Sequence, residues 1–406
     1  MTARNAEALD VHLGVERVGR LRRTEHGARF EYDARWVELH RSDPERSIAI
    51  RMPVRAEPYD VAGVNLHPFF AGLLPEGLRL RALVRASKTS EDDLFSLFAA
   101  IGADTIGDVS ATVEGEAPQE RAAVAPPGTW EQMDFRELLE RSLALDSVAA
   151  HSSFAGVMPK VSAAMISVPL RRSGTTRHYL LKLSPPDFPR LVENEAFFMA
   201  ASRAAGIETA EVELVRDARG EAALVVERFD RVAAGDGNVQ RIHQEDVCQL
   251  LGRYPADKYR LKLQDVSDAL EVASAPVVAR LELLRRQAFA YAVANGDLHA
   301  KNLSVLRRSG LIALTPAYDI VSTLPYGDAK LALALEGRDD RLTWKHFAAF
   351  GERNGVSAAS VRRVLASLVK RLAPLTERVG EIGLTDKQTS HLAKAMAKRL
   401  AALEPE

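Results

Sequence analysis

Cysteine is almost absent from this sequence, because Cys248 is the only one in 406 residues. A single thiol cannot form a disulfide within the chain, and it cannot build a zinc site from cysteine ligands. One free thiol fits a reducing compartment. The composition therefore excludes intrachain disulfides and cysteine-based zinc centres.

Long apolar stretches are missing as well. No run approaches the ~18 residues that a membrane-spanning helix needs. The opening residues, MTARNAEALDVHLG, lack the cationic segment and apolar core of a secretory signal. We therefore expect a soluble, cytoplasmic protein with no membrane partner.

The chain also lacks an excess of either charge. Its 54 Lys and Arg residues nearly balance its 55 Asp and Glu residues, which gives a formal net charge of −1. A protein whose whole surface binds nucleic acid is usually clearly basic, so we do not expect that kind of binding. Two arginine-rich stretches, 17–23 and 362–371, leave local contact with DNA phosphates as an open alternative. Such charge runs more often lie on solvated faces.

The composition that is present, with 47% hydrophobic and 27% charged residues, is typical of a globular protein, and the length favours two or three domains. Residues 1–113 predict short strands followed by helices. The stretches VHLGVERVGRL and FEYDARWVEL alternate as strands do. SEDDLFSLFAAIG predicts a helix that begins at Ser90 and stops at Gly102.

The rest of the chain divides into a linker and two further regions. Residues 114–130, EGEAPQERAAVAPPGTW, have the composition of a linker. Residues 131–235 predict a small mixed lobe, with Lys182 near the end of the strand RHYLLKLS, a helix ENEAFFMAASRAAG that ends at Gly206, and a strand AALVVERF. Residues 236–406 are mainly helical, interrupted by a hairpin with the strands LSVL and LIAL.

Two motifs in the helical region carry the strongest chemical signal. The loop NGDLHAKN places Asp297 five residues before Asn302, which is the spacing of a protein-kinase catalytic loop. The carboxylate accepts the proton of an attacking hydroxyl, and the amide oxygen binds Mg²⁺ together with Asp319, which follows the hairpin. The alternative is that Asp297 and His299 only form and cap a turn. Because loop, hairpin and later aspartate follow the kinase order, we favour the catalytic interpretation.

Lys182 is the second candidate. A lysine on a buried strand needs an anionic partner, because an unpaired buried ammonium is very costly. The phosphates of ATP would supply one, and so would Glu195 in the next helix. The alternative is that the head group reaches solvent at the end of the strand.

Two other segments give weaker signals. In SSFAGVMPK, residues 152–160, small residues let backbone N–H groups approach a phosphate, and Lys160 could add charge. This segment is not a Walker A loop, and it lacks the kinase G-x-G-x-x-G. VERF, residues 226–229, ends a strand where a kinase hinge would offer backbone groups to adenine, although a plain core strand explains it equally well.

The order of these motifs resembles the HipA family of toxin serine/threonine kinases. The resemblance is carried by SFAGVMPK, YLLKLS, ENEAFF, LVVERFDR, QEDVCQLLG, NGDLHAKNLSVL and PAYDIVS, with FFAGLLPEG and FSLFAAIGADTIGDV resembling the amino-terminal subdomain of that family. It covers roughly residues 65–330. It implies an α+β, kinase-like fold of two lobes, one small and mixed and one mainly helical, with an N-terminal β-rich subdomain.

The resemblance also implies roles for particular residues. Asp297 would be the catalytic base, Asn302 and Asp319 the Mg²⁺ ligands, and Lys182 the lysine that holds the ATP phosphates. The remaining nucleotide contacts would come from a phosphate loop, a hinge and the catalytic region: Ala155, Gly156, Val157, Met158, Pro159, Lys160, Glu227, Arg228, Phe229, His299, Ala300, Lys301 and Tyr318. The phosphate loop has Met158-Pro159 where an acidic or amide residue is common in the family, which leaves open whether its amide geometry follows the usual pattern.

Members of this family phosphorylate translation components, typically an aminoacyl-tRNA synthetase, and pair with a small DNA-binding antitoxin that links them to operator DNA. The resemblance therefore implies a kinase toxin that uses ATP and Mg²⁺. It also implies inhibitory autophosphorylation at Ser153, with the adjacent Ser152 as the alternative site. Two other functions stay open, a small-molecule phosphotransferase with a kinase-like fold and a non-catalytic module that bridges an antitoxin to DNA.

Overall fold

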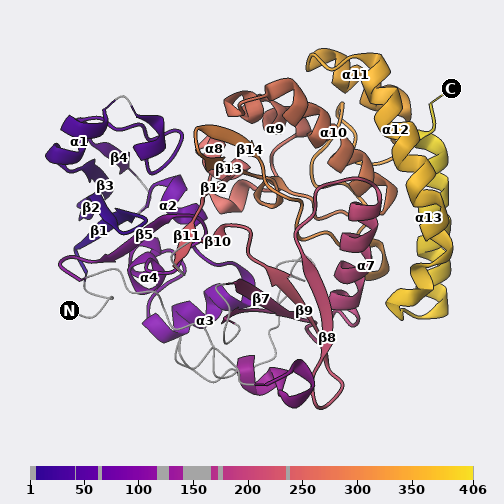
Figure 1. The fold of residues 1–406 in the computed structure, drawn as a ribbon, viewed down its shortest axis with the longest axis horizontal. Coiled ribbons are helices and arrows are strands. Elements are labelled where there is room, and N and C mark those ends of the chain that lie inside the picture. The colour runs from indigo at the N-terminus through magenta and orange to yellow at the C-terminus, as the bar shows by residue number, and fades with distance from the viewer. Residues whose placement is uncertain are drawn as a thin grey trace.

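A computed structural model shows a mixed α/β chain whose N-terminal subdomain, small lobe and helical part lie side by side (Figure 1). This agrees with the predicted α+β class. Among the residues described, no helix is both long and apolar enough to cross a membrane. The structure describes residues 6–41, 43–62, 66–116, 128–139, 166–171 (as a strand only), 177–234 and 238–405.

The N-terminal subdomain, residues 6–116, is built around an antiparallel sheet with the strand order β4-β3-β2-β1-β5. β5 comes from the far end of the subdomain and pairs with β1, with Val113 opposite Leu9. Both ends of the subdomain therefore close on one sheet. The strands are β1 (Ala8–Leu13), β2 (Glu16–Thr24), β3 (Gly27–Tyr32), β4 (Tyr59–Ala62) and β5 (Val109–Val113).

Helices pack on this sheet through buried aromatic rings. The ring of Phe70 lies 5.7 Å from that of Phe30 on β3 and 5.5 Å from that of Phe98, measured between centroids. Segment 73–76 contains Pro75, which disfavours helical backbone in the residue before it and separates two of the helices. The helices are α1 (Ala34–His40), α2 (Pro68–Gly72), α3 (Gly77–Ser87) and α4 (Leu94–Ile101).

The strand predicted over FEYDARWVEL is wrong in its second half. β3 ends at Tyr32, and α1 begins after Asp33. Trp36 and Val37 are buried on this helix, whereas Leu39 is 63% exposed. A pattern this short cannot separate a strand from two helical turns, because both can place a few apolar residues against a core.

Helix α4 also begins later than predicted. Its N-cap is Asp93, whose Oδ1 accepts the N–H of Ser96 at 3.2 Å. The hydroxyl of Ser90 instead accepts the N–H of Asp92, also at 3.2 Å, so it forms a turn before the helix. Gly102 follows the last residue of the helix, as predicted.

The small lobe is an antiparallel sheet with the order β6-β7-β9-β8 and one helix packed on it. The two strands predicted from the sequence are β7 and β9, and their register places Lys182 opposite Leu224. The predicted left-handed glycine after the helix is Gly206, with φ +84°. The elements are β6 (Ile166–Arg171), β7 (His178–Leu183), α7 (Leu191–Ala204), β8 (Val212–Arg216) and β9 (Ala222–Glu227), followed by the ribbon β10 (Arg231–Ala233) and β11 (Val239–Arg241).

The helical part contains the predicted hairpin, β13 and β14, paired with β12. The turn uses Ser309 and Gly310, with φ +52° and +77°, and positive φ at both central residues suits a two-residue hairpin loop. The predicted long helix is α10, which packs against α11, α12 and α13 (Figure 1). The elements are β12 (His243–Asp246), α8 (Val247–Leu251), α9 (Leu263–Ala269), α10 (Pro276–Ala292), β13 (Ser304–Arg308), β14 (Leu311–Leu314), α11 (Trp344–Arg353), α12 (Ala358–Leu372) and α13 (Asp386–Leu403).

Buried polar contacts fix the N-terminal subdomain to the helical part. His243 on β12 lies between two carboxylates, with Nδ1 2.7 Å from Asp108 Oδ1 and Nε2 2.9 Å from Glu245 Oε1. The same Glu245 oxygen accepts the N–H of Ile50 at 2.7 Å. Burial disfavours the charged imidazole, but the carboxylate of Asp108 outweighs burial and raises the pKa of His243 to about 9. His243 is therefore a charged link between the two parts at neutral pH.

Candidate active site

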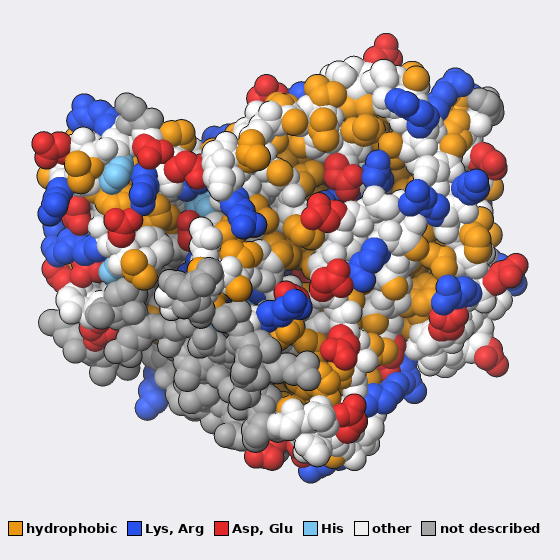
Figure 2. Space-filling view, viewed as in Figure 1, with side chains coloured by type: hydrophobic (Ala, Val, Ile, Leu, Met, Phe, Trp, Pro, Cys, Tyr) orange, Lys and Arg blue, Asp and Glu red, His pale blue; other side chains and the backbone are white. Residues whose placement is uncertain are grey.

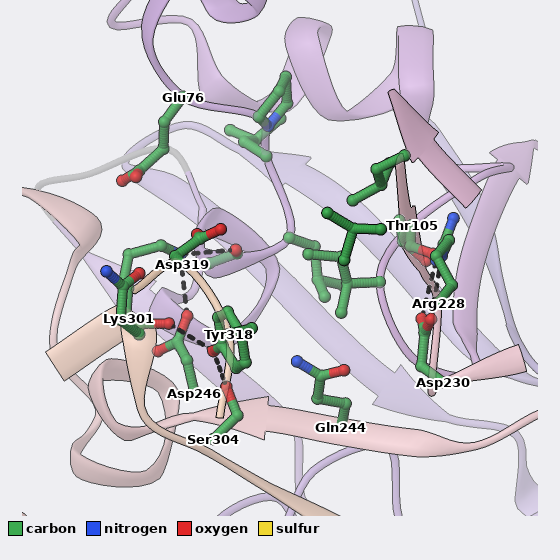
Figure 3. A pocket seen from close by; sticks show the side chains of 18 of the residues that line it. Glu76, Thr105, Arg228, Asp230, Gln244, Asp246, Lys301, Ser304, Tyr318 and Asp319 are labelled. Atoms are coloured by element: carbon green, nitrogen blue, oxygen red, sulfur yellow. Dashed lines mark hydrogen bonds and ion pairs between the residues drawn. The ribbon is translucent and has the colours of Figure 1, made fainter. Parts of the chain in front are cut away.

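A cavity of about 350 Å³ lies where the N-terminal subdomain, the small lobe and the helical part meet. Figure 3 shows Asp319 and Lys301 at one end of it and Arg228 at the other. Segment 72–76 of the N-terminal subdomain forms part of its wall. The predicted site residues that line it are Lys182, Glu227, Arg228, Phe229, His299, Lys301, Asn302, Tyr318 and Asp319.

Lys182 is buried on β7 and has two carboxylate partners. Its Nζ lies 2.7 Å from Glu195 Oε1 on α7, and it also forms an ion pair with Asp319. Burial alone would lower the pKa of the ammonium, but the charges of Asp319 and Glu195 outweigh it and hold the Lys182 pKa above its ordinary value. The head group is therefore a fixed positive charge on the cavity wall, with Glu195 as the partner that the sequence suggested.

The catalytic-loop candidate Asp297 is 1% exposed, and hydrogen bonds of its backbone N–H and carbonyl fix its position. Its N–H donates to Asn295 Oδ1 at 2.9 Å, and its carbonyl accepts the N–H of His299 at 2.8 Å. The same carbonyl accepts Nδ2 of Asn302 at 2.9 Å. Because the amide nitrogen of Asn302 is used in this way, its Oδ1 is the atom that can serve as a metal ligand.

The start of this loop depends on a close approach between two backbone segments. The N–H of Gly296 donates to Thr323 Oγ1 at 2.8 Å. A Cβ atom at Gly296 would lie 2.6 Å from the carbonyl oxygen of Lys330, so a larger residue cannot be placed there without moving the backbone. The glycine of the NGD motif therefore has a steric reason to be present.

A residue that the sequence analysis did not select holds the carboxylate of Asp297. Tyr259 donates its hydroxyl to Asp297 Oδ1 at 2.6 Å, and its ring lies edge-on to His299 with 4.9 Å between centroids. Tyr259 precedes Asp297 by 38 residues and belongs to no motif. No local pattern in the sequence marks a lone tyrosine at that distance.

Lys301 lines the cavity, but its ammonium contacts other groups of the protein. Nζ lies 2.8 Å from Asp246 Oδ2 and 3.0 Å from the carbonyl oxygen of Gly72. Burial is outweighed by the charge of Asp246, so the pKa of Lys301 lies above its ordinary value. Its neighbour Ala300 is buried, and its N–H donates to the carbonyl of Lys258 at 3.3 Å. Lys301 thus joins the catalytic loop to β12 and to the N-terminal subdomain.

Tyr318 and Asp319 follow the hairpin and lie against the catalytic loop (Figure 3). The hydroxyl of Tyr318 donates to the carbonyl of Lys301 at 2.8 Å and lies 2.6 Å from Ser304 Oγ. Asp319 has φ +53°, a left-handed conformation that aspartate tolerates better than most residues. Such conformations cluster at functional sites.

The donor set at this end of the cavity suits a hard divalent cation. Asn302 offers an amide oxygen and Asp319 a carboxylate, and Mg²⁺ typically uses one or two protein ligands with phosphates and water. The part of the chain that the structure describes contains no cluster of three His, Cys, Asp or Glu residues able to hold a metal. With Asn302 and Asp319 as the oxygen ligands, the residues present fit a metal whose other ligands would come from nucleotide phosphates and water.

The hinge candidates also line the cavity, and Arg228 lies at the end away from Asp319 and Lys301 (Figure 3). The N–H of Glu227 donates to the carbonyl of Glu211, and the N–H of Arg228 donates to the carbonyl of His178, both at 2.9 Å. These two donors are therefore already used within the protein. Phe229 presents its ring next to Tyr318, with 5.7 Å between centroids, and so forms an apolar part of the cavity wall beside the catalytic loop.

The side chains beside the hinge connect it to the N-terminal subdomain. Arg228 forms two hydrogen bonds with Asp230, at 2.9 and 2.7 Å. Asp230 also accepts the N–H of Gly107 at 2.9 Å, and Arg231 donates to the carbonyl of Thr105 at 2.7 Å. The loop of the N-terminal subdomain that contains Thr105 and Gly107 is thus fixed to the residues that directly follow the hinge candidates.

The predicted phosphate loop, Ala155 to Lys160, and the predicted modification sites Ser152 and Ser153 lie outside the described residues. The roles assigned to them therefore stay predictions. Of the other predicted site residues, Asp297 and Ala300 do not line the cavity but belong to the loop that does.

Comparison with a solved structure shows the same fold. The Shewanella oneidensis HipA chain, solved in a complex of HipA, HipB and operator DNA, superposes with a TM-score of 0.76. The match covers 97% of both chains at 22% sequence identity. The kinase-like fold of that chain is therefore shared along nearly the whole of this one.

Comparisons of sequence identify the family to which this chain belongs. The chain is 32% identical to the protein named "Putative kinase Y4mE" of Sinorhizobium fredii, over 94% of this chain and 95% of the relative. It is 26% identical to the serine/threonine-protein kinase toxin HipA of Shewanella oneidensis, over 93% of each chain. The HipA N-terminal domain matches residues 9–112, and the HipA-like C-terminal domain matches residues 152–375. With both domains matched in order along more than half of its length, the chain belongs to the HipA family.

Proposed function

We propose that the protein is a serine/threonine protein kinase that uses ATP and Mg²⁺ and acts as the toxin of a toxin–antitoxin pair. The observation that carries this proposal is the cavity that brings Lys182, Asn302 and Asp319 together, with Asp297 in the loop beside them. A positive charge, two oxygen ligands and a carboxylate base are what phosphoryl transfer requires of a protein.

In this mechanism Asp297 orients the hydroxyl of a substrate serine or threonine and takes its proton as the oxygen attacks the γ-phosphorus of ATP. The bond between that phosphorus and the oxygen of the leaving ADP breaks. Asn302 Oδ1 and the Asp319 carboxylate would hold Mg²⁺, which neutralises phosphate charge when bound.

Lys182 has a second part in this proposal. In the structure its ammonium contacts both Glu195 and Asp319. A phosphate placed against Lys182 would replace Asp319 as its second anionic partner and would release that carboxylate for the metal. Glu195, which lies on α7, would keep Lys182 in position throughout.

The proposed partners follow from relatives. The Shewanella HipA chain was solved with HipB and operator DNA. We infer that this chain pairs with a small DNA-binding antitoxin, which supplies the contact with operator DNA. Acidic and basic side chains are mixed over the face seen in Figure 2, which fits DNA contact through a partner. As substrate we propose a translation component such as an aminoacyl-tRNA synthetase.

We also propose autophosphorylation at Ser153, or at the adjacent Ser152. A phosphate adds about −1.5 to −2 charges at neutral pH. Placed in the segment that would bind the phosphates of ATP, it would repel the nucleotide and silence the kinase. Mass spectrometry of protein incubated with ATP and Mg²⁺ tests this, and modified protein that binds ATP as tightly as unmodified protein would contradict the silencing.

The central experiment compares the purified protein with the Asp297→Asn variant in an ATP-consumption assay and in transfer of labelled phosphate to bacterial proteins. We expect Asp297→Asn to keep nucleotide binding and to lose transfer by about 100-fold or more, because only the base is removed. Near wild-type turnover by Asp297→Asn would refute the mechanism. Transfer to a small molecule, with no labelled protein, would favour a small-molecule phosphotransferase.

A further inference from the structure

The hydroxyl of Tyr259 contacts the side chain that the proposed mechanism uses as a base. The Tyr259 oxygen lies 2.6 Å from Asp297 Oδ1, a short distance typical of a strong hydrogen bond to a carboxylate. We infer that Tyr259 is a positioning residue that fixes the orientation of the Asp297 carboxylate for phosphoryl transfer. This inference rests on the proposed kinase function and adds to it a residue outside the catalytic loop.

The geometry explains why such a residue matters. An aspartate carboxylate can rotate about its Cβ–Cγ bond, and the hydrogen bonds described for the Asp297 backbone do not restrict that rotation. A donor held at Oδ1 sets the plane of the carboxylate and therefore the direction in which Oδ2 points. The carboxylate oriented in this way would receive the proton of the substrate hydroxyl.

The phenol is suited to remain a donor. Burial raises the pKa of Tyr259, and the nearby negative charge of Asp297 raises it further. Tyr259 therefore keeps its proton at neutral pH and does not compete with Asp297 as a base.

The ring of Tyr259 contacts two neighbouring side chains. It packs edge-on against His299 of the catalytic loop. Nζ of Lys258 lies 5.4 Å from the centroid of the Tyr259 ring, and the same Nζ is 2.7 Å from Glu76 Oε2 of the N-terminal subdomain. The carbonyl of Lys258 accepts the N–H of Ala300 in the catalytic loop. Tyr259 is thus fixed relative to the loop that it orients.

The test is Tyr259→Phe, which removes the hydroxyl and keeps the ring that packs on His299. We expect kcat for phosphoryl transfer to fall by about 10- to 100-fold, because a small misplacement of a catalytic group costs that much. The dissociation constant for ATP should stay within about twofold, because the hydroxyl acts only through Asp297. If Tyr259 had a purely structural role, its loss would impair both kcat and ATP binding.

The matched control is Tyr254→Phe, which removes a similar hydroxyl that bonds to the carbonyl of Leu66 in the N-terminal subdomain at 3.0 Å. It should leave kcat within about twofold of wild type. If Tyr259→Phe has the kcat of wild type or a higher one, or loses no more than Tyr254→Phe, the inference is overturned.

A double variant separates this inference from the proposed function. In single-turnover measurements, Tyr259→Phe added to Asp297→Asn should cause no further loss, because two changes that act through one carboxylate are not additive. An equal fold-loss in both backgrounds would show that Tyr259 acts independently of Asp297. A wild-type protein that transfers no phosphate refutes the proposed function itself, whereas an active wild type with an unimpaired Tyr259→Phe refutes only the positioning role.

Discussion

Lys182 on β7 and Glu195 on α7 form a buried ion pair with 2.7 Å between Nζ and Oε1, and Asp319 from the helical part contacts the same ammonium. One ammonium group thus forms ion pairs with two carboxylates that come from different parts of the fold. The contact joins the small lobe to the segment after the hairpin. This contact gives Lys182 a role in stability in addition to the nucleotide binding that we propose for it.

Lys182→Ala should abolish or strongly reduce phosphoryl transfer, and ATP affinity should fall by about 10-fold or more, because a charge-assisted contact with phosphate is lost. It should also lower the free energy of unfolding by about 3 kcal/mol, because it leaves Glu195 buried without its partner. Denaturant titration and calorimetric ATP binding measure the two effects.

The control for this prediction is the double variant Lys182→Ala/Glu195→Gln. A neutral amide at position 195 removes the unpaired charge, so stability should largely return while ATP binding and transfer stay impaired. Activity restored together with stability would remove Lys182 from the nucleotide site.

Asp319→Asn should change the response to Mg²⁺. An amide oxygen is a weaker ligand than a carboxylate for a hard cation, so half-maximal activity should require about 10-fold more Mg²⁺ or more. Titration of activity with Mg²⁺ at saturating ATP measures this. A Mg²⁺ titration identical to that of wild type would show that the metal is held by other residues.

His243 should make stability depend on pH. Its pKa in the folded protein, about 9, is higher than the ordinary value of 6.5, so the protonated ring stabilises the fold. The contribution is complete below about pH 6.5 and is lost as the pH rises through about 9, and its size is at most about 3 kcal/mol.

Unfolding of wild type and His243→Gln at several pH values measures this contribution. The difference in stability between the two proteins should be largest near pH 6 and should shrink toward pH 10. His391→Gln, on the exposed face of α13, is the control and should show no such trend. A difference that is constant with pH would exclude a charged His243.

Expression in a bacterial host should arrest growth if the protein acts as a toxin. Asp297→Asn, expressed at the same level, should allow growth, because only catalysis is removed. Colony counts after induction measure growth, and immunoblots measure the expression level of each protein. Arrest by both proteins would indicate a non-catalytic effect such as binding to a partner.

Local patterns predicted the part of the site that is continuous in the sequence. The helix α10, the loop that carries Asp297 and Asn302, and the hairpin follow one another in the chain, and each has its own signal in periodicity, motif or turn residues. The strand with Lys182 and the helix with Glu195 were also predictable, because their patterns are long enough to be distinct. The catalytic and binding roles of these residues stay predictions.

The contacts that could not be predicted join residues far apart in the chain. Tyr259 meets Asp297 across 38 residues, and Lys258 meets Glu76 across 182. In the sequence, Tyr259, Lys258 and Glu76 are each indistinguishable from an ordinary surface or core residue. Their importance depends on tertiary packing, which periodicity and spacing do not describe.

The N-terminal subdomain forms a wall of the cavity, and this limits how the protein can be shortened. A fragment that begins at residue 128 would lose Asp108, the partner of buried His243. It would also lose the carbonyls of Pro44 and Ser47 that accept the guanidinium of Arg307 at 2.6 and 2.5 Å. Such a truncation would leave His243 with Glu245 as its remaining carboxylate partner and would remove these acceptors from buried Arg307, so crystallisation and assay call for a chain that keeps the N-terminal subdomain.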